Sequence, residues 1–210
     1  MNDFKLYLET GFQHIANWNG QLSFWSQLAG LTTSDHILFI IALTIRYQFA
    51  DWKKVLVLVT AFTIGHSITL ALSVLNIVTY SVNWIEFLIP ITILITAISN
   101  LFVKKFVFKT KFPPIYFMAL FFGLIHGLGF SSYLKSLLGK DQGIFSQLLA
   151  FNLGLELGQI LIVLIILIIS FVFVGLIKVN RREWLLFVSA AVFALALNMA
   201  LDRLHNVLPQ

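Results

Sequence analysis

The chain contains no cysteine among its 210 residues, so neither a disulfide nor a thiolate-bound metal ion can form. Charged residues are also scarce, at 11% of the chain, whereas a soluble domain carries roughly a quarter. Hydrophobic residues make up 59%, and the mean hydropathy is +0.92. This composition excludes an ordinary soluble domain and predicts an integral membrane protein, with the lipid bilayer as its first partner.

The sequence also shows no sign of a nucleic-acid partner or of a signal peptide. The net charge of +5 does not indicate a nucleic-acid partner, because the basic residues lie in short segments between apolar stretches. The N-terminus lacks the basic start, apolar core and small-residue cleavage site of a signal peptide. Its apolar residues instead recur at helical spacing, at Phe4, Leu8, Phe12 and Ile15. Residues 1–28 are therefore expected to form an amphipathic segment at the membrane surface.

Six apolar stretches are long enough to cross a bilayer, at about 20 residues each. They are 29–48, 54–78, 83–103, 114–134, 147–177 and 184–203. The fifth is longer than one perpendicular helix needs. We expect an all-α, polytopic membrane helix bundle of about six transmembrane helices, with residues 29–205 as a single transmembrane domain.

Basic residues predict the orientation of this bundle. Ten of the fourteen lie in or beside the connections that follow the first, third and fifth stretches. These ten are Arg46, Lys53, Lys54, Lys104, Lys105, Lys109, Lys111, Lys178, Arg181 and Arg182. Because basic loops stay in the cytoplasm, we expect a multi-pass protein of the bacterial inner (cytoplasmic) membrane with both termini outside.

Ionisable side chains interrupt the apolar stretches. They are Asp35, His36, His66, His126 and Glu156. At a rise of about 1.5 Å per residue, all five fall in the outer half of the bilayer. An ionisable side chain inside the membrane costs free energy, so its presence there usually indicates a functional site. They predict one cavity that opens to the outside. His14 and His205, in polar surroundings, are expected at the surface, and Asp202 and Arg203 are expected to meet water.

This set of side chains suits a transition metal. Imidazole and carboxylate ligands favour zinc, nickel or another first-row ion, whereas oxygen ligands alone would favour magnesium or calcium. Gln159 lies one helical turn beyond Glu156. The competing interpretation is structural: each polar group would only hydrogen-bond neighbouring helices.

A short internal repeat accompanies these residues. Residues 61–68 (AFTIGHSI) and 150–157 (AFNLGLEL) share the frame A-F-polar-aliphatic-G, followed by His66 in one copy and Glu156 in the other. The two copies are 89 residues apart, and His36 and His126 are 90 residues apart. The repeat therefore predicts that His36 and His126 hold equivalent positions in the two halves. Two halves of three spans each would be inverted, a 3+3 arrangement typical of transporters with a site between the repeats.

Two functions fit this arrangement. A permease would hold a transition-metal ion transiently and would need a polar path through the inner half. A zinc-dependent intramembrane hydrolase would keep its metal and activate water on it, with Glu156 or Asp35 as general base and a lipid or lipoprotein as substrate. We expect a permease for an ion of the nickel, cobalt and zinc class, with the hydrolase as the alternative. The sequence does not decide whether the chain forms a homo-oligomer.

The residues around these sites resemble the HupE/UreJ family of small bacterial membrane proteins, with a composition similar to its Bacteroidetes-type branch. The similar segments are 34–39 (SDHILF), 52–54 (WKK), 60–70 (TAFTIGHSITL), 123–130 (GLIHGLGF) and 151–159 (FNLGLELGQ). The resemblance implies about six spans and, from better-known relatives, nickel or cobalt permeation linked to hydrogenase and urease maturation.

The resemblance also implies a ligand set. Its members are His36, His66, His126 and Glu156, with Asp35 as ligand or orienter. Gln159, Ser67 and His14 are our further candidates for contacts that support these ligands. The nickel permeases carry a further histidine a few residues before the Asp-His pair. Here Gly30–Ser34 hold none, and His14 is the nearest upstream histidine. This departure from the family pattern removes the basis for nickel specificity. With the ligand chemistry, we expect a transition-metal ion, zinc or nickel.

Overall fold

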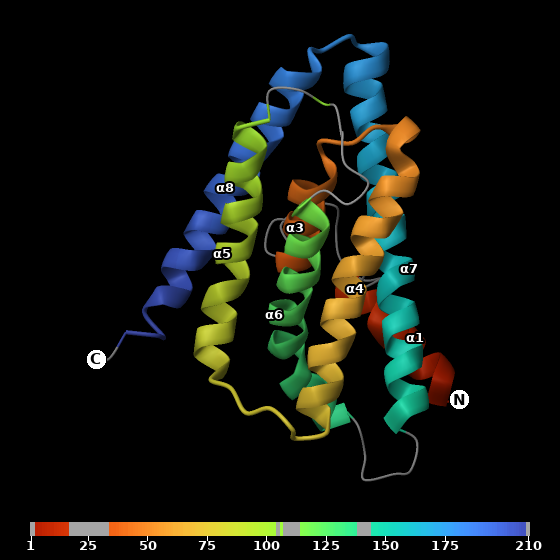
Figure 1. Ribbon diagram of the computed structural model, residues 1–210, viewed down its shortest axis with the longest axis vertical. Helices are drawn as coiled ribbons and strands as arrows, with labels where there is room; N and C mark the ends of the chain where they lie inside the picture. Colours follow the sequence, from red (N-terminus) through yellow and green to blue (C-terminus); the bar gives the residue numbers. More distant parts are fainter. Residues whose placement is uncertain (1–2, 17–33, 104–105, 107–113, 138–143, 209–210) are drawn as a thin grey trace, which may run out of the picture.

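The computed structural model describes residues 3–16, 34–103, 106, 114–137 and 144–208, and these residues form a helical bundle without strands (Figure 1). The α-helices are α1 (Asp3–Ala16), α3 (Asp35–Thr44), α4 (Trp52–Val74), α5 (Val82–Leu101), α6 (Pro114–Leu137), α7 (Ile144–Ser170) and α8 (Arg181–Leu204). A 3-10 turn, Phe49–Asp51, precedes α4, and a π-helical segment, Phe171–Leu176, extends α7. The predicted all-α membrane bundle is confirmed.

The predicted spans agree with the helices except at the first. Five helical segments are long and apolar enough to cross a membrane: Phe49–Val74, Val82–Leu101, Pro114–Leu137, Ile144–Leu176 and Arg181–Leu204. The predicted span 29–48 contains α3, which has only 10 residues and is about 15 Å long. A helix of that length cannot cross alone, and residues 29–33 lie outside the described part of the chain. The fifth span is one long helix that continues into the π-helical segment.

One end of the bundle gathers the basic connections. The Arg181 guanidinium donates to the Arg46 carbonyl at 2.7 Å and lies 3.9 Å from the Asp51 carboxylate. The same guanidinium stacks over Phe106, 4.0 Å from the ring centroid. The first, third and fifth connections therefore meet at one end, which we call the basic end. The start of α1 and the end of α8 lie toward the opposite end (Figure 1).

Two helix pairs form the centre of the bundle through close backbone contacts at glycine. In the α4–α6 pair, a Cβ on Gly65 would overlap the Leu120 carbonyl oxygen, and one on Gly123 would overlap that of Phe62. Only glycine permits helix backbones to approach so closely. The two helices run in the same direction, away from the basic end (Figure 1).

The α1–α7 pair repeats these contacts. A Cβ on Gly11 would overlap the Phe151 carbonyl oxygen, and one on Gly154 would overlap that of Leu8. Since Phe62 and Phe151 hold the same place in the A-F-polar-aliphatic-G frame, α4 corresponds to α7 and α6 to α1. The helix α7 runs toward the basic end, opposite to α4 (Figure 1), so the two pairs are related by inversion.

This correspondence corrects the predicted pairing of His36 with His126. The helix α6 contains Gly123-x-x-His126, and α1 contains Gly11-x-x-His14. The two glycines make equivalent contacts, so the counterpart of His126 is His14. The helix α1 thus packs against a membrane-spanning helix and contributes a residue to the centre of the bundle. A position for residues 1–28 at the membrane surface remains a prediction.

Candidate metal centre

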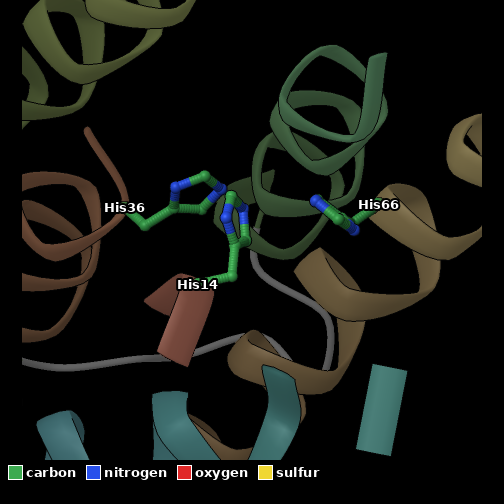
Figure 2. A group of neighbouring side chains, drawn as sticks. All are labelled: His14, His36 and His66. Carbon is green, nitrogen blue, oxygen red and sulfur yellow. The ribbon is translucent and has the colours of Figure 1, made fainter. Parts of the chain in front are cut away.

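Three histidines from three different helices meet inside the bundle. His14 on α1, His36 on α3 and His66 on α4 each offer one ring nitrogen, and these three nitrogens lie within 4.8 Å of one another (Figure 2). The ring centroids of His14 and His36 are 4.5 Å apart, and each lies about 6 Å from that of His66 (6.2 and 6.1 Å). We call this group the histidine triad.

His126 on α6 adjoins the triad. Its ring centroid lies 5.1 Å from that of His36, and its Nε2 lies 3.0 Å from Thr92 Oγ1 on α5. His126 and His66 are both fully buried. Four of the five histidines of the chain therefore occupy one place, and the fifth, His205, is exposed.

The imidazoles present buried nitrogens that lack partners. Within the described residues, no hydrogen-bond partner is found for Nε2 of His14, Nε2 of His36, both nitrogens of His66 or Nδ1 of His126. A buried polar atom left unpaired costs about 1–3 kcal/mol. Native proteins rarely tolerate several such atoms in one place unless a ligand satisfies them. The donor set, all imidazole nitrogen, matches a first-row transition ion such as zinc, nickel or copper.

A cavity of about 400 Å³ lies beside the cluster. It is lined by His14, Ser34, Asp35, His36, Glu86, Ile89, His126, Gly129, Phe130 and Arg203. His66 is fully buried and is not among the lining residues. A hydrated ion with six waters, at roughly 30 Å³ each, occupies ~180 Å³, so the cavity can admit an ion with its water shell. The predicted single cavity thus has three of the four histidines in its wall.

Asp35 and Arg203 form an ion pair in this wall. Arg203 Nη2 lies 2.9 Å and 3.1 Å from the two Asp35 carboxylate oxygens. Arg203 Nη1 donates to the Glu86 carbonyl at 2.8 Å. That carbonyl lies four residues before Pro90, which has no N–H to donate to it within α5. Arg203 was expected to meet water; it is instead held by two contacts at the cavity, because α8 ends beside the first turn of α3.

Glu156 and Gln159 lie between α4 and α7. The Glu156 carboxylate accepts a hydrogen bond from Thr60 at 2.9 Å, and the Gln159 amide oxygen accepts one from Thr63 at 2.8 Å. Ser67 donates to the Thr63 carbonyl at 2.7 Å. The metal-ligand geometry of the triad includes neither predicted carboxylate: Asp35 pairs with Arg203, and Glu156 faces Thr60.

Aromatic rings close the cluster toward the basic end. Phe39 and Phe62 are fully buried, with centroids 4.9 Å apart. Each lies against His126, at 5.1 Å and 5.2 Å. Beyond them, Arg46 donates to Asn100 Oδ1 at 3.0 Å through Nε. An ion can therefore reach the histidines from the cavity, whereas the Phe39 and Phe62 rings close the cluster on the opposite side.

A protein-family model described as "HupE / UreJ protein" matches residues 1–203. The chain belongs to the HupE/UreJ family. No curated protein and no solved structure gives a significant match. Membership of the HupE/UreJ family, together with the triad, identifies a membrane protein whose function concerns metal ions. Its assignment to a Bacteroidetes-type branch stays a prediction.

The main residue that sequence reasoning misplaced in this HupE/UreJ protein is His14. Polar surroundings suggested a surface position, yet its ring is in the triad and its Nε2 is buried. The G-x-x-H spacing shared with His126 was the available signal. Thr92 was also missed, because a threonine in an apolar helix carries no sign of its partner.

Proposed function

We propose that the protein is a transition-metal permease, which takes an ion from the cavity and binds it transiently at the histidine cluster before passing it inward. The observation that carries this proposal is the set of unpartnered imidazole nitrogens on His14, His36, His66 and His126. They come from four helices and face one another beside a cavity large enough for a hydrated ion.

The triad is suited to transit because its ligands are neutral. A divalent ion bound only by imidazoles keeps its full charge in a low-dielectric interior, where an uncompensated charge is costly. A thiolate or carboxylate in direct contact would lower that cost and slow release. Arg203 offsets the charge of Asp35 in the cavity wall. The Glu86 carboxylate in the same wall is then the group that attracts a cation without binding it at the cluster. Zinc and nickel both match these ligands.

The arrangement corresponds to a state accessible from one side. The cavity reaches His14, His36 and His126, while Phe39 and Phe62 cover the cluster on the side of the basic end. We place the protein in the bacterial inner membrane with its basic end in the cytoplasm. In this orientation the cavity opens to the outside of that membrane, and both termini are on the same side as the cavity. Inward release then requires Phe39 and Phe62 to move apart, and the inverted α1–α7 and α4–α6 pairs supply two rigid bodies that could rock about the site.

The hydrolase alternative has less support. Its general base would be Glu156 or Asp35, and both carboxylates are engaged: Asp35 accepts from Arg203 and Glu156 from Thr60. A general base must reach a metal-bound water with a free oxygen, and both Asp35 oxygens already accept from Arg203. A permanently bound zinc ion that survives dialysis would favour the hydrolase.

The proposal is tested with untagged protein reconstituted into liposomes. Zinc and nickel uptake, followed by a metal-sensitive dye inside, should occur in wild type and fall to the level of empty liposomes in His66→Ala. His205→Ala is the matched control because its ring is exposed and outside the cluster. Uptake in His66→Ala equal to that in His205→Ala would refute the proposal. Metal content after dialysis separates an exchangeable ion from a permanent one.

A further inference from the structure

Among the residues that the structure describes, Thr92 on α5 is the one side chain that makes a hydrogen bond to an imidazole of the histidine cluster. Its side chain is 2% exposed, and its Oγ1 lies 3.0 Å from His126 Nε2. His126 is itself fully buried, so water does not compete for this contact. The direction of the hydrogen bond decides which nitrogen of His126 carries its proton.

The threonine hydroxyl has a single hydrogen and can donate only once. Thr92 donates that hydrogen to the Ile89 carbonyl, at 2.6 Å within its own helix. Toward His126 the hydroxyl oxygen must therefore accept, and His126 Nε2 must donate. In the neutral ring the proton then sits on Nε2, and the lone pair sits on Nδ1.

His126 Nδ1 is among the buried nitrogens without a partner. His126 also lines the cavity together with His36 and His14. A nitrogen that carries a lone pair and no hydrogen bond is ready to bind an ion without first losing a proton. Metal-bound histidines commonly donate their second N–H to a fixed acceptor in this way.

We propose that Thr92 is a positioning residue that sets His126 in the Nε2–H tautomer, so that Nδ1 is ready to bind an ion next to the histidine triad. The His126 ring adjoins that of His36 but lies outside the ligand group of the triad, so it offers a further nitrogen beside the three. The effect on metal affinity rests on the proposed function, whereas the tautomer is a property of the metal-free protein. The inference also assigns the ion class: one that prefers imidazole ligands, as zinc, nickel and copper do.

Thr96 provides a matched control one helical turn further along α5. Its side chain is fully buried, and its hydroxyl donates to the Thr92 carbonyl at 2.8 Å, a bond of the same kind as that from Thr92 to Ile89. No hydrogen bond joins Thr96 to a histidine among the described residues. Thr92→Val and Thr96→Val therefore remove the same group from equally buried places, and only the first removes the acceptor for His126.

The first measurement uses nuclear magnetic resonance of metal-free protein labelled at histidine with ¹³C and ¹⁵N, with His126 assigned through its loss in His126→Gln. In wild type and Thr96→Val, His126 should show a protonated Nε2 and an unprotonated Nδ1. Thr92→Val should lose this single pattern, and Thr92→Ser, which keeps the hydroxyl, should retain it. A proton on Nδ1 in wild type, or an unchanged pattern in Thr92→Val, would overturn the proposal.

The second measurement is zinc and nickel affinity of the same variants. Loss of such a supporting hydrogen bond typically weakens metal binding about 10–100-fold, so Thr92→Val should bind at least about tenfold more weakly. Thr96→Val and Thr92→Ser should remain close to wild type. Equal losses in Thr92→Val and Thr96→Val would show a packing effect and overturn the role of Thr92. Failure of wild type to bind either ion would instead defeat the proposed function, while the tautomer would still be decided by the resonance experiment.

Discussion

Arg203 Nη2 donates to both carboxylate oxygens of Asp35, at 2.9 Å and 3.1 Å. This contact joins the last turn of α8 to the first residue of α3, and so holds the helix that carries His36. Both side chains are largely covered, with 25% and 17% of their surfaces exposed, so solvent screens the pair less than a surface ion pair.

Arg203→Gln should therefore lower the stability of the protein. Hydrogen bonds to charged groups contribute about 1.5–3 kcal/mol, and the substitution leaves the Asp35 carboxylate without its cation. The thermal unfolding midpoint in detergent should fall, and the double variant Asp35→Asn/Arg203→Gln should recover part of the loss. Asp202→Asn, at an exposed neighbour, is the control. If the double variant lost as much stability as Arg203→Gln and Asp35→Asn together, a direct interaction between the two side chains would be contradicted.

Substitution of Gly123 should separate α4 from α6. Alanine normally stabilises a helix relative to glycine by about 1 kcal/mol. At Gly123 its Cβ would overlap the Phe62 carbonyl oxygen, so the unfolding midpoint of Gly123→Ala should fall. Gly129→Ala is the comparison, because its Cβ would meet the terminal methyl of Ile89 at 2.7 Å, which a side chain can relieve by rotation. An equal effect of both substitutions would argue against the backbone contact.

His14→Ala should weaken metal binding as His36→Ala does. The His14 and His36 nitrogens belong to one triad, and the loss of a direct ligand costs more than the loss of a supporting hydrogen bond. We expect the affinity for zinc and nickel, measured by isothermal titration calorimetry, to fall by about 100-fold or more. This exceeds the usual loss when only a hydrogen bond that supports a ligand is removed. Gln13→Ala, an exposed change on the same helix, should have no effect. An affinity of His14→Ala near that of wild type would remove α1 from the site.

Glu156→Gln tests whether this carboxylate binds the ion directly. Glutamine preserves an oxygen that accepts from Thr60, so packing between α4 and α7 should be retained. Because the triad does not include Glu156, affinity should stay within a few-fold of wild type in the same calorimetric titration. A loss as large as that in His66→Ala would place Glu156 among the ligands, as the family resemblance implies.

Orientation is tested by fusion of a reporter after Gln210. With the basic end in the cytoplasm, alkaline phosphatase at this position should be active and green fluorescent protein dark. A second fusion in the connection between α7 and α8, near Lys178, should give the opposite result. A fluorescent C-terminal fusion would invert the proposed direction of the cavity.

Much of the fold was predictable because hydrocarbon imposes strong constraints on sequence. Each membrane-crossing helix requires about 20 apolar residues, and that pattern located α4 to α8 well. The first span failed because apolar composition continues through residues 29–48 while α3 occupies only Asp35–Thr44 among the described residues. Hydropathy measures solvent preference and does not report where a helix begins or which short helices are packed inside the bundle.

The sequence alone determined that the protein lies in a membrane and that His36, His66 and His126 are costly residues there, because both conclusions follow from the chemistry of single side chains in hydrocarbon. Only the tertiary structure decided that His14 joins them, that Arg203 pairs with Asp35, and that Thr92 contacts His126. These are contacts between helices far apart in sequence. The place of His14 also depends on the glycines that let the α1 and α7 backbones approach each other.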